Sequence, residues 1–181
     1  GPVGIISLEM REYNLRRRMV YEDADVVLGN VDKGWLTEPE QERVIRTIEE
    51  HRKLPIFVDD SPGNIDQVRS RIHKMVSVHK VKMIWVDHLH HIRMKKRDKK
   101  SDVAYNIEVL DDLFKSLGVP GGVLCQLSRP EKGKEDRKPT LSDLRWAGEI
   151  EQVAESVTMI AKEEDDGRAV ALPKNRDGSP M

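Results

Sequence analysis

The sequence predicts an α/β fold in which a mostly parallel sheet is flanked by helices. Short apolar runs rich in β-branched residues alternate along the chain with longer segments whose apolar residues recur at helical spacing. The runs are almost uniformly apolar, which is typical of strands in a parallel sheet with both faces covered. A length of 181 residues fits one domain.

The first half of the chain supplies three of the expected strands. In chain order, we expect a strand at residues 3–8, an amphipathic helix at 11–21, a loop around 29–34, a helix ending near 51, a strand at 55–58, a helix at 65–76 and a strand at 83–86 that closes on Asp87. Thr37 with Glu40 three residues later forms a capping box that starts the second helix. Asp59 and Asp60 are expected to form an Asx-type turn before Pro62.

The second half continues the alternation. An apolar stripe predicts a helix at 107–117, which Gly118 and Pro120 end, and residues 123–126 read as the next strand. A short helix at 150–154 and strands at 157–160 and 169–172 complete the pattern. Strands of a parallel sheet place functional residues at their carboxyl ends, so we expect a site there.

Composition narrows the function classes only partly. The formal net charge of −1 neither requires nor excludes an acidic partner such as DNA, so any argument for nucleic acid must be local. A single cysteine excludes an intramolecular disulfide and favours a reducing, cytoplasmic location. No apolar run reaches about 18 residues, so no membrane association is expected. Gly1 and Pro2 are interpreted as the remnant of a cleaved tag, and residues 3–181 as the domain itself.

Three expected strands end in a polar residue of a catalytic type: Glu9, Asp87 and Gln126. Neighbouring parallel strands point the same way, so these side chains can converge although they are far apart in sequence. An apolar strand that ends in Asp is a common magnesium site in nucleotide hydrolases, because Mg²⁺ prefers carboxylate and water oxygens. The alternative is that each residue is simply a polar end of its strand.

Several motifs in one order carry a family resemblance. They are Ser-Leu-Glu-Met at 7–10, Ile-Phe-Val-Asp-Asp-Ser-Pro-Gly at 56–63, the strand that ends at Asp87, Gln-Leu-Ser-Arg at 126–129, the segment 141–152 with its Leu-Ser-Asp-Leu-Arg start, and Lys-Asn-Arg-Asp-Gly at 174–178. Together they resemble the RecA-like motor domain of the DnaB family of replicative DNA helicases.

The resemblance implies an ATP-dependent DNA helicase with Mg²⁺ as its metal cofactor. Glu9 would be the general base that activates water, Asp87 would act on Mg²⁺ directly or through water, and Gln126 would sense the terminal phosphate. Lys174 and Arg176 would reach the nucleotide of the next subunit in a ring, expected to be a hexamer. A primase and a helicase loader are further partners implied, in a bacterial cell or phage-infected host.

Two loops are implied to contact single-stranded DNA. The first is a locally basic run that contains Arg93, Lys95, Lys96 and Arg97, although such a run is otherwise a solvated loop. The second runs from 143 to 148, where Arg145 and Gly148 match the family pattern. Trp146 and Ala147 depart from it. A tryptophan there can stack on a base or pack against a neighbour, and we favour packing.

The phosphate-binding motif Gly-x-x-x-x-Gly-Lys-[Ser/Thr] is absent from the sequence. We therefore expect a domain incomplete at its amino end, which binds ATP weakly or not at all alone and has an exposed sheet edge prone to association. Two alternatives remain: a RecA-like recombination or loading ATPase, and a non-catalytic binding module that lacks the phosphate loop.

Two further groups are expected to be structural. His88, His90 and His91 follow a strand, and on alternating faces only two of them would point the same way, so a metal site is not expected there. Cys125, placed inside the strand at 123–126, is expected to be a small core residue rather than a nucleophile.

Overall fold

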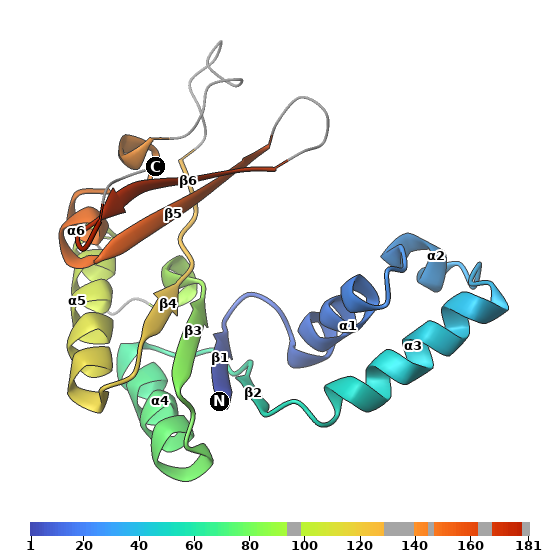
Figure 1. The fold of residues 1–181 in the computed structure, drawn as a ribbon. Helices are drawn as coiled ribbons and strands as arrows, with labels where there is room; N and C mark the ends of the chain where they lie inside the picture. Colours follow the sequence, from blue (N-terminus) through green and yellow to red (C-terminus); the bar gives the residue numbers. More distant parts are fainter. Residues whose placement is uncertain (94–98, 129–139, 145–146, 163–167, 179–181) are drawn as a thin grey trace.

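Four parallel strands form the central sheet of this computed structural model, in the order β2-β1-β3-β4. Its described residues are 1–93, 99–128, 140–144, 147–162 and 168–178. The strands are β1 (Val3–Ser7), β2 (Ile56–Asp59), β3 (Met83–Asp87) and β4 (Gly121–Val123). The register pairs Ser7 with Asp87 and Val86 with Val123, so the carboxyl ends of β1, β3 and β4 lie along one edge. The expected mostly parallel sheet is confirmed (Figure 1).

One face of this sheet is buried under α4 (Ile65–His79) and α5 (Lys99–Leu117). Alternate strand residues point to it, and Ile6, Ile84 and Val86 are fully buried there. They pack with helix residues that are also fully buried, among them Val68 and Ile72 on α4 and Val103 and Leu110 on α5. This layer forms the main core.

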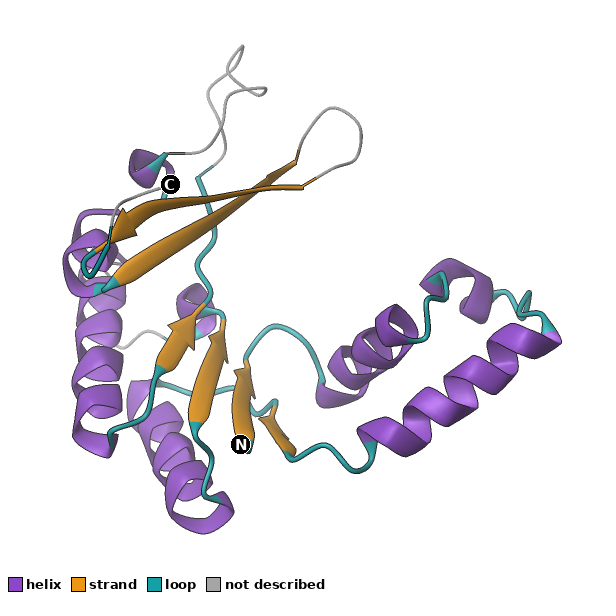
Figure 2. Cartoon of the chain, viewed as in Figure 1, coloured by secondary structure: helices purple, strands orange, loops and turns teal. Residues whose placement is uncertain are grey.

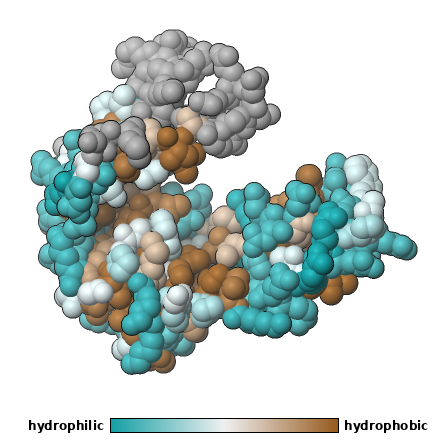
Figure 3. All heavy atoms as spheres, in the orientation of Figure 1, coloured by the Kyte–Doolittle hydropathy of each residue, from teal (hydrophilic) through white to brown (hydrophobic). Residues whose placement is uncertain are grey.

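The other residues of β1 and β3 face a less covered side. Val3 and Ile5 are half-buried, and Trp85, which is paired with Ile5, is 39% exposed. Figure 3 shows apolar side chains at the surface in the middle of this view, near the place where the sheet meets the arm of helices. Within the described residues, the sheet is therefore better covered on one side than on the other.

Three helices form an arm beside the sheet (Figures 1 and 2). They are α1 (Glu12–Asp23), α2 (Leu28–Asp32) and α3 (Glu38–His51), and a small cluster built on Ala24, Val26 and Val44 holds them together. The helix expected to begin at the Thr37 cap is confirmed, and the Glu40 carboxylate accepts a hydrogen bond from the Thr37 N–H at 2.7 Å. The loop expected around 29–34 was wrong in part, because residues 28–32 form α2.

The carboxyl-terminal part is an antiparallel hairpin of β5 (Ser156–Lys162) and β6 (Arg168–Asn175), preceded by α6 (Ala147–Val153). Both strands were expected, and they pair with each other in a separate two-stranded sheet. The strand expected at 123–126 was misplaced, since β4 ends at Val123. Gly121 and Gly122 carry no side chains that a hydrophobic pattern could register, so the sequence signal began too late. Within the part of the chain that the structure describes, none of the helices has the length and hydropathy of a membrane span.

Candidate functional site

The expected site residues lie along the carboxyl edge of the sheet. Glu9 follows β1, Asp87 ends β3 and Gln126 lies three residues beyond β4. Because β3 is the neighbour of both β1 and β4, Glu9 and Gln126 follow the two strands that flank the strand of Asp87. A cavity of about 300 Å³ lies one strand away, beside β2, where its lining includes Glu12, Asp59 and Arg71.

A tight turn after β1 presents Glu9 to solvent. The Ser7 side chain is fully buried, and its hydroxyl donates to the Met10 carbonyl at 2.7 Å. The Leu8 N–H donates to the Asp87 carbonyl at 2.5 Å, which ties the turn to the end of β3. Glu9 therefore stands exposed beside Asp87 on a turn fixed at both sides.

Burial is the main influence on the Asp87 carboxyl. It raises the pKa above the ordinary value, and the nearby Glu9 carboxylate raises it further. His88 and His91 act in the opposite direction and lower this pKa. Two carboxylates and two imidazoles are thus near enough to one another to interact electrostatically.

The histidines after β3 do not continue the strand. Residues Leu89–His91 form a 3₁₀ turn, which brings His88 and His91 together with 4.1 Å between their ring centroids. His88 Nε2 also lies 3.4 Å from a Glu9 carboxylate oxygen. The expectation of alternating faces was therefore wrong, because the chain turns immediately after Asp87. In a 3₁₀ turn, residues three apart lie on the same side, so the spacing of His88 and His91 was the sequence feature that could have indicated their contact.

Gln126 and Cys125 lie just past β4. The Gln126 side chain is exposed, and its backbone N–H makes a long hydrogen bond of 3.5 Å to His90 Nδ1. Cys125 packs against the main core, as expected, although outside the strand, and burial raises the pKa of its thiol to about 12. A thiol with that pKa is largely protonated at neutral pH and is a poor nucleophile.

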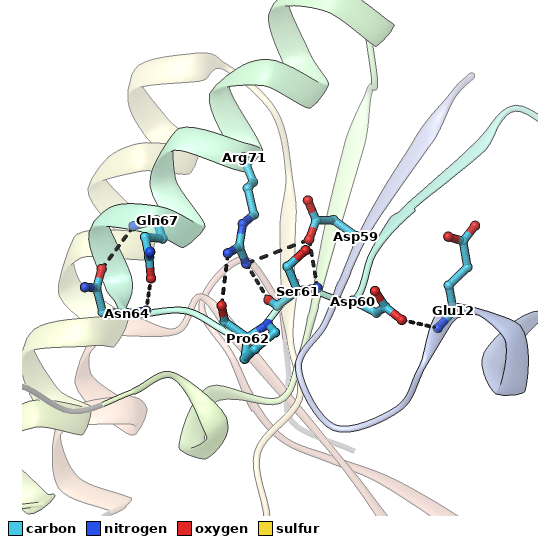
Figure 4. Close-up of polar contacts among 8 residues, drawn as sticks. All are labelled: Glu12, Asp59, Asp60, Ser61, Pro62, Asn64, Gln67 and Arg71. Atoms are coloured by element: carbon cyan, nitrogen blue, oxygen red, sulfur yellow. Dashed lines mark hydrogen bonds and ion pairs between the residues drawn. The ribbon is translucent and has the colours of Figure 1, made fainter.

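The turn after β2 forms a second polar cluster near this edge (Figure 4). Asp59 accepts a hydrogen bond from the Ser61 N–H at 2.9 Å, the Asx turn that was expected. Asp60 was expected to share that role, but its carboxylate instead accepts from the Glu12 N–H at 2.9 Å and so caps the start of α1. The Arg71 guanidinium on α4 donates to the Ser61 and Pro62 carbonyls. Arg71 thus holds the turn against α4 through two hydrogen bonds, a role that the sequence did not indicate.

Only part of the two implied DNA loops lies within the described residues. Arg93 is exposed, and its backbone N–H donates to the Gly63 carbonyl at 2.8 Å, which fixes the start of the basic run against the turn after β2. Gly148 lies exposed in the first turn of α6. Lys95, Lys96, Arg97, Arg145 and Trp146 lie outside the described residues.

Lys174 and Arg176 belong to the hairpin segment and contact α6. The Lys174 ammonium donates to the Glu151 carbonyl, and the Arg176 guanidinium donates to the Gln152 carbonyl. Both cations therefore lie at the carboxyl end of α6, where they complement the helix dipole. The structure does not bring them to Glu9 or Asp87.

Comparisons with known proteins agree on one family. Residues 1–180 match the model of the DnaB-like helicase C-terminal domain. The replicative DNA helicase DnaB of Rickettsia typhi is 33% identical over 165 residues, which are 90% of this chain and 33% of that protein. The replicative DNA helicase DnaB of Mycobacterium leprae is 30% identical over 185 residues, 96% of this chain and 31% of that protein. The chain thus spans about a third of the length of these curated relatives.

Solved structures show the same fold. One of them, described as an ATPase domain, has a TM-score of 0.88 at 21% identity and is matched over 99% of this chain and 69% of that one. A DnaB-like replicative helicase, described with its interactions with primase, also has a TM-score of 0.88, at 20% identity, over 99% of this chain and 46% of that one. The expected RecA-like α/β class is confirmed by these matches.

Proposed function

The chain belongs to the DnaB-like helicase C-terminal domain family, and we propose that in the intact protein it is part of the motor of an ATP-dependent replicative DNA helicase. The observation that carries this proposal is that Glu9, on the turn after β1, lies near Asp87, which ends the adjacent parallel strand β3, within a chain that matches the family over residues 1–180. The named curated relatives are replicative helicases, so a recombination ATPase is not favoured.

Glu9 is proposed as the general base. An exposed carboxylate on a fixed turn suits the task of orienting a water and accepting its proton. Asp87 is the proposed Mg²⁺ ligand, directly or through water, because a half-buried carboxylate at the end of a strand suits a hard divalent cation. Bound Mg²⁺ would neutralise charge on the phosphates of ATP. Gln126, on the same edge, is the proposed phosphate sensor.

The remaining parts of the motor are proposed from the family. The phosphate-binding loop would come from residues that precede this segment in the intact protein. Lys174 and Arg176 would reach the neighbouring subunit of a ring, proposed as a hexamer, after leaving their contacts on α6. Single-stranded DNA would be bound by cations and by a close backbone approach at Arg93, Lys95, Lys96, Arg97, Arg145 and Gly148.

The cellular setting is proposed in the same way. A solved DnaB-like helicase is described with its interactions with primase, and a primase and a helicase loader are proposed as partners here. The relatives are bacterial, so the proposed location is the cytoplasm of a bacterial cell or a phage-infected host.

The gene supplies a first test. Sequencing upstream of Val3 should find an in-frame phosphate-binding loop within about 40 residues, a length consistent with one βαβ unit. An upstream stop codon, or an upstream segment without the motif, would favour the non-catalytic binding module.

The decisive measurement is DNA-stimulated ATP hydrolysis by the intact protein and its Glu9→Gln variant. Loss of the base should lower kcat by roughly 100- to 10,000-fold. The matched control is Glu49→Gln, which removes an exposed carboxylate on α3 that pairs with Arg52. Equal hydrolysis by the parent protein and the Glu9→Gln variant would remove Glu9 from the mechanism.

A further inference from the structure

Three metal-ligating side chains meet at the turn after β3. Glu9, His88 and His91 each offer one ligand atom, and these atoms all lie within 4.8 Å of one another. Glu9 comes from the turn after β1, whereas both histidines come from the 3₁₀ turn that follows Asp87. We propose that this trio binds a divalent transition-metal ion, for which Zn²⁺ is the test ion.

The geometry is close to that of a bound ion. Zinc bonds of about 2.0–2.1 Å in a tetrahedral site place neighbouring ligand atoms roughly 3.3 Å apart. His88 Nε2 is already 3.4 Å from the Glu9 carboxylate oxygen. Glu9 and His91 are both exposed, so small rotations of these two side chains can close the remaining gap. Two histidines and one carboxylate, with a water as fourth ligand, is a common zinc ligand set.

The alternative to a bound metal ion is an ion pair in which protonated His88 faces the Glu9 carboxylate. A proton shared by His88 and Glu9 joins only two of the three donors, whereas one cation joins all three. The Asp87 carboxylate lies beside the trio and adds negative charge that favours a cation.

The ligand types select the metal class. Imidazole nitrogens suit zinc and similar transition metals, while Mg²⁺ prefers carboxylate and water oxygens. The proposed site is therefore distinct from the Mg²⁺ role of Asp87. Its existence does not depend on Glu9 being a base, although a Glu9 that ligates a metal ion is not free to accept a proton from water.

The test is a Zn²⁺ titration of this 181-residue chain against a chromogenic chelator. We expect one saturable site per chain, with binding at least tenfold weaker in His88→Ala, His91→Ala and Glu9→Gln. His73→Ala, which removes an exposed histidine on α4, is the matched control and should bind as the parent does. Excess Mg²⁺ should not displace the Zn²⁺.

Circular dichroism and Co²⁺ absorption separate the loss of a metal ligand from the loss of folding. His91 is exposed, so His91→Ala should retain the parent circular dichroism spectrum even if His88→Ala, with its side chain only 13% exposed, loses stability. Co²⁺ bound at the site should show the strong visible absorption of a low-coordinate complex, and this absorption should be lost in His91→Ala. Undiminished Zn²⁺ binding by His91→Ala, displacement by Mg²⁺, or the absence of a saturable site in the parent would each overturn the proposal. Reduced Zn²⁺ binding by Glu9→Gln with unchanged ATP hydrolysis would support the metal site and contradict only the proposed base.

Discussion

Two aromatic rings approach β4 at consecutive glycines. A Cβ atom on Gly121 would lie 2.1 Å from the Phe114 ring of α5, and one on Gly122 would lie 2.4 Å from the Trp85 ring of β3. Successive strand residues point to opposite faces, so the rings lie on opposite sides of the sheet. Packing of the two rings therefore requires glycine at both positions. The same two glycines have no apolar side chains, so the hydrophobic pattern did not indicate that β4 begins there.

Replacing Gly121 by Ala should destabilise the fold by about 1–3 kcal/mol, because the Phe114 ring packs against the main core and has little room to move. Gly122→Ala should cost less, since Trp85 is 39% exposed and its ring can shift toward solvent. Urea unfolding would measure both. Gly29→Ala in α2 has no atom within 4 Å of the new methyl group and should be neutral or slightly stabilising. Equal stability of Gly121→Ala and the parent would show that Phe114 yields freely.

The sequence predicted the polar residues of the candidate site better than their arrangement. Glu9 and Asp87 were identified because each ends or follows an apolar strand, and parallel pairing then makes them neighbours. The meeting of His88 and His91 was not predicted, because it depends on a 3₁₀ turn that no hydrophobic period records. The brace from Arg71 to the Ser61 and Pro62 carbonyls was missed for a similar reason: it joins two elements through backbone oxygens.

Two helices begin with side-chain caps that differ in their surroundings. The Asn64 side-chain oxygen accepts from the Asp66 and Gln67 N–H groups, each at 3.1 Å. The Gln67 side chain accepts from the Asn64 N–H at 3.0 Å, and Figure 4 shows the contacts between Asn64 and Gln67. This cap starts α4, which covers the main sheet, and Asn64 also pairs with Arg93. The Thr37 cap starts α3 in the arm.

Asn64→Ala should lower the free energy of unfolding by about 1 kcal/mol, because it leaves two N–H groups at the start of α4 without their acceptor. Urea unfolding followed by far-UV circular dichroism would measure the change. Asn64→Asp keeps an acceptor and should recover most of the loss. Loss of the same size in Asn64→Asp would show that the side-chain cap is not the source of the effect.

Helices were easier to place from sequence than strands. Residues 65–76 fell inside α4 (Ile65–His79), and the residues from the Thr37 cap to His51 matched α3 (Glu38–His51), because periodic apolar residues and caps are local signals. The short helix α2 was not predicted, because its sequence Leu-Gly-Asn-Val-Asp contains turn formers. Its stability comes from packing within the arm. The antiparallel pairing of β5 with β6 could not be predicted, because apolar runs indicate where strands lie but not which strands pair.

At the scale of the whole molecule, the sheet has two edges among the described residues. β2 pairs with β1 alone, and β4 pairs with β3 alone. Next to the β4 edge, Leu124 is 42% exposed and Trp85 is 39% exposed. An unpaired edge beside apolar side chains is a template for association with another chain.

This surface predicts concentration-dependent self-association of the chain, measured as a rise in mean mass during sedimentation equilibrium. Leu124→Lys places a charge beside the β4 edge and should weaken association at least tenfold, which corresponds to about 1.4 kcal/mol. The control is Val78→Lys, which removes an apolar side chain that is 61% exposed on α4 and is not part of the β4 edge. An equal effect of the two substitutions would assign association to general surface hydrophobicity, and a parent chain of constant monomer mass would show that the edge is already protected. A fall limited to Leu124→Lys would identify the β4 edge as the place where this domain accepts a further strand.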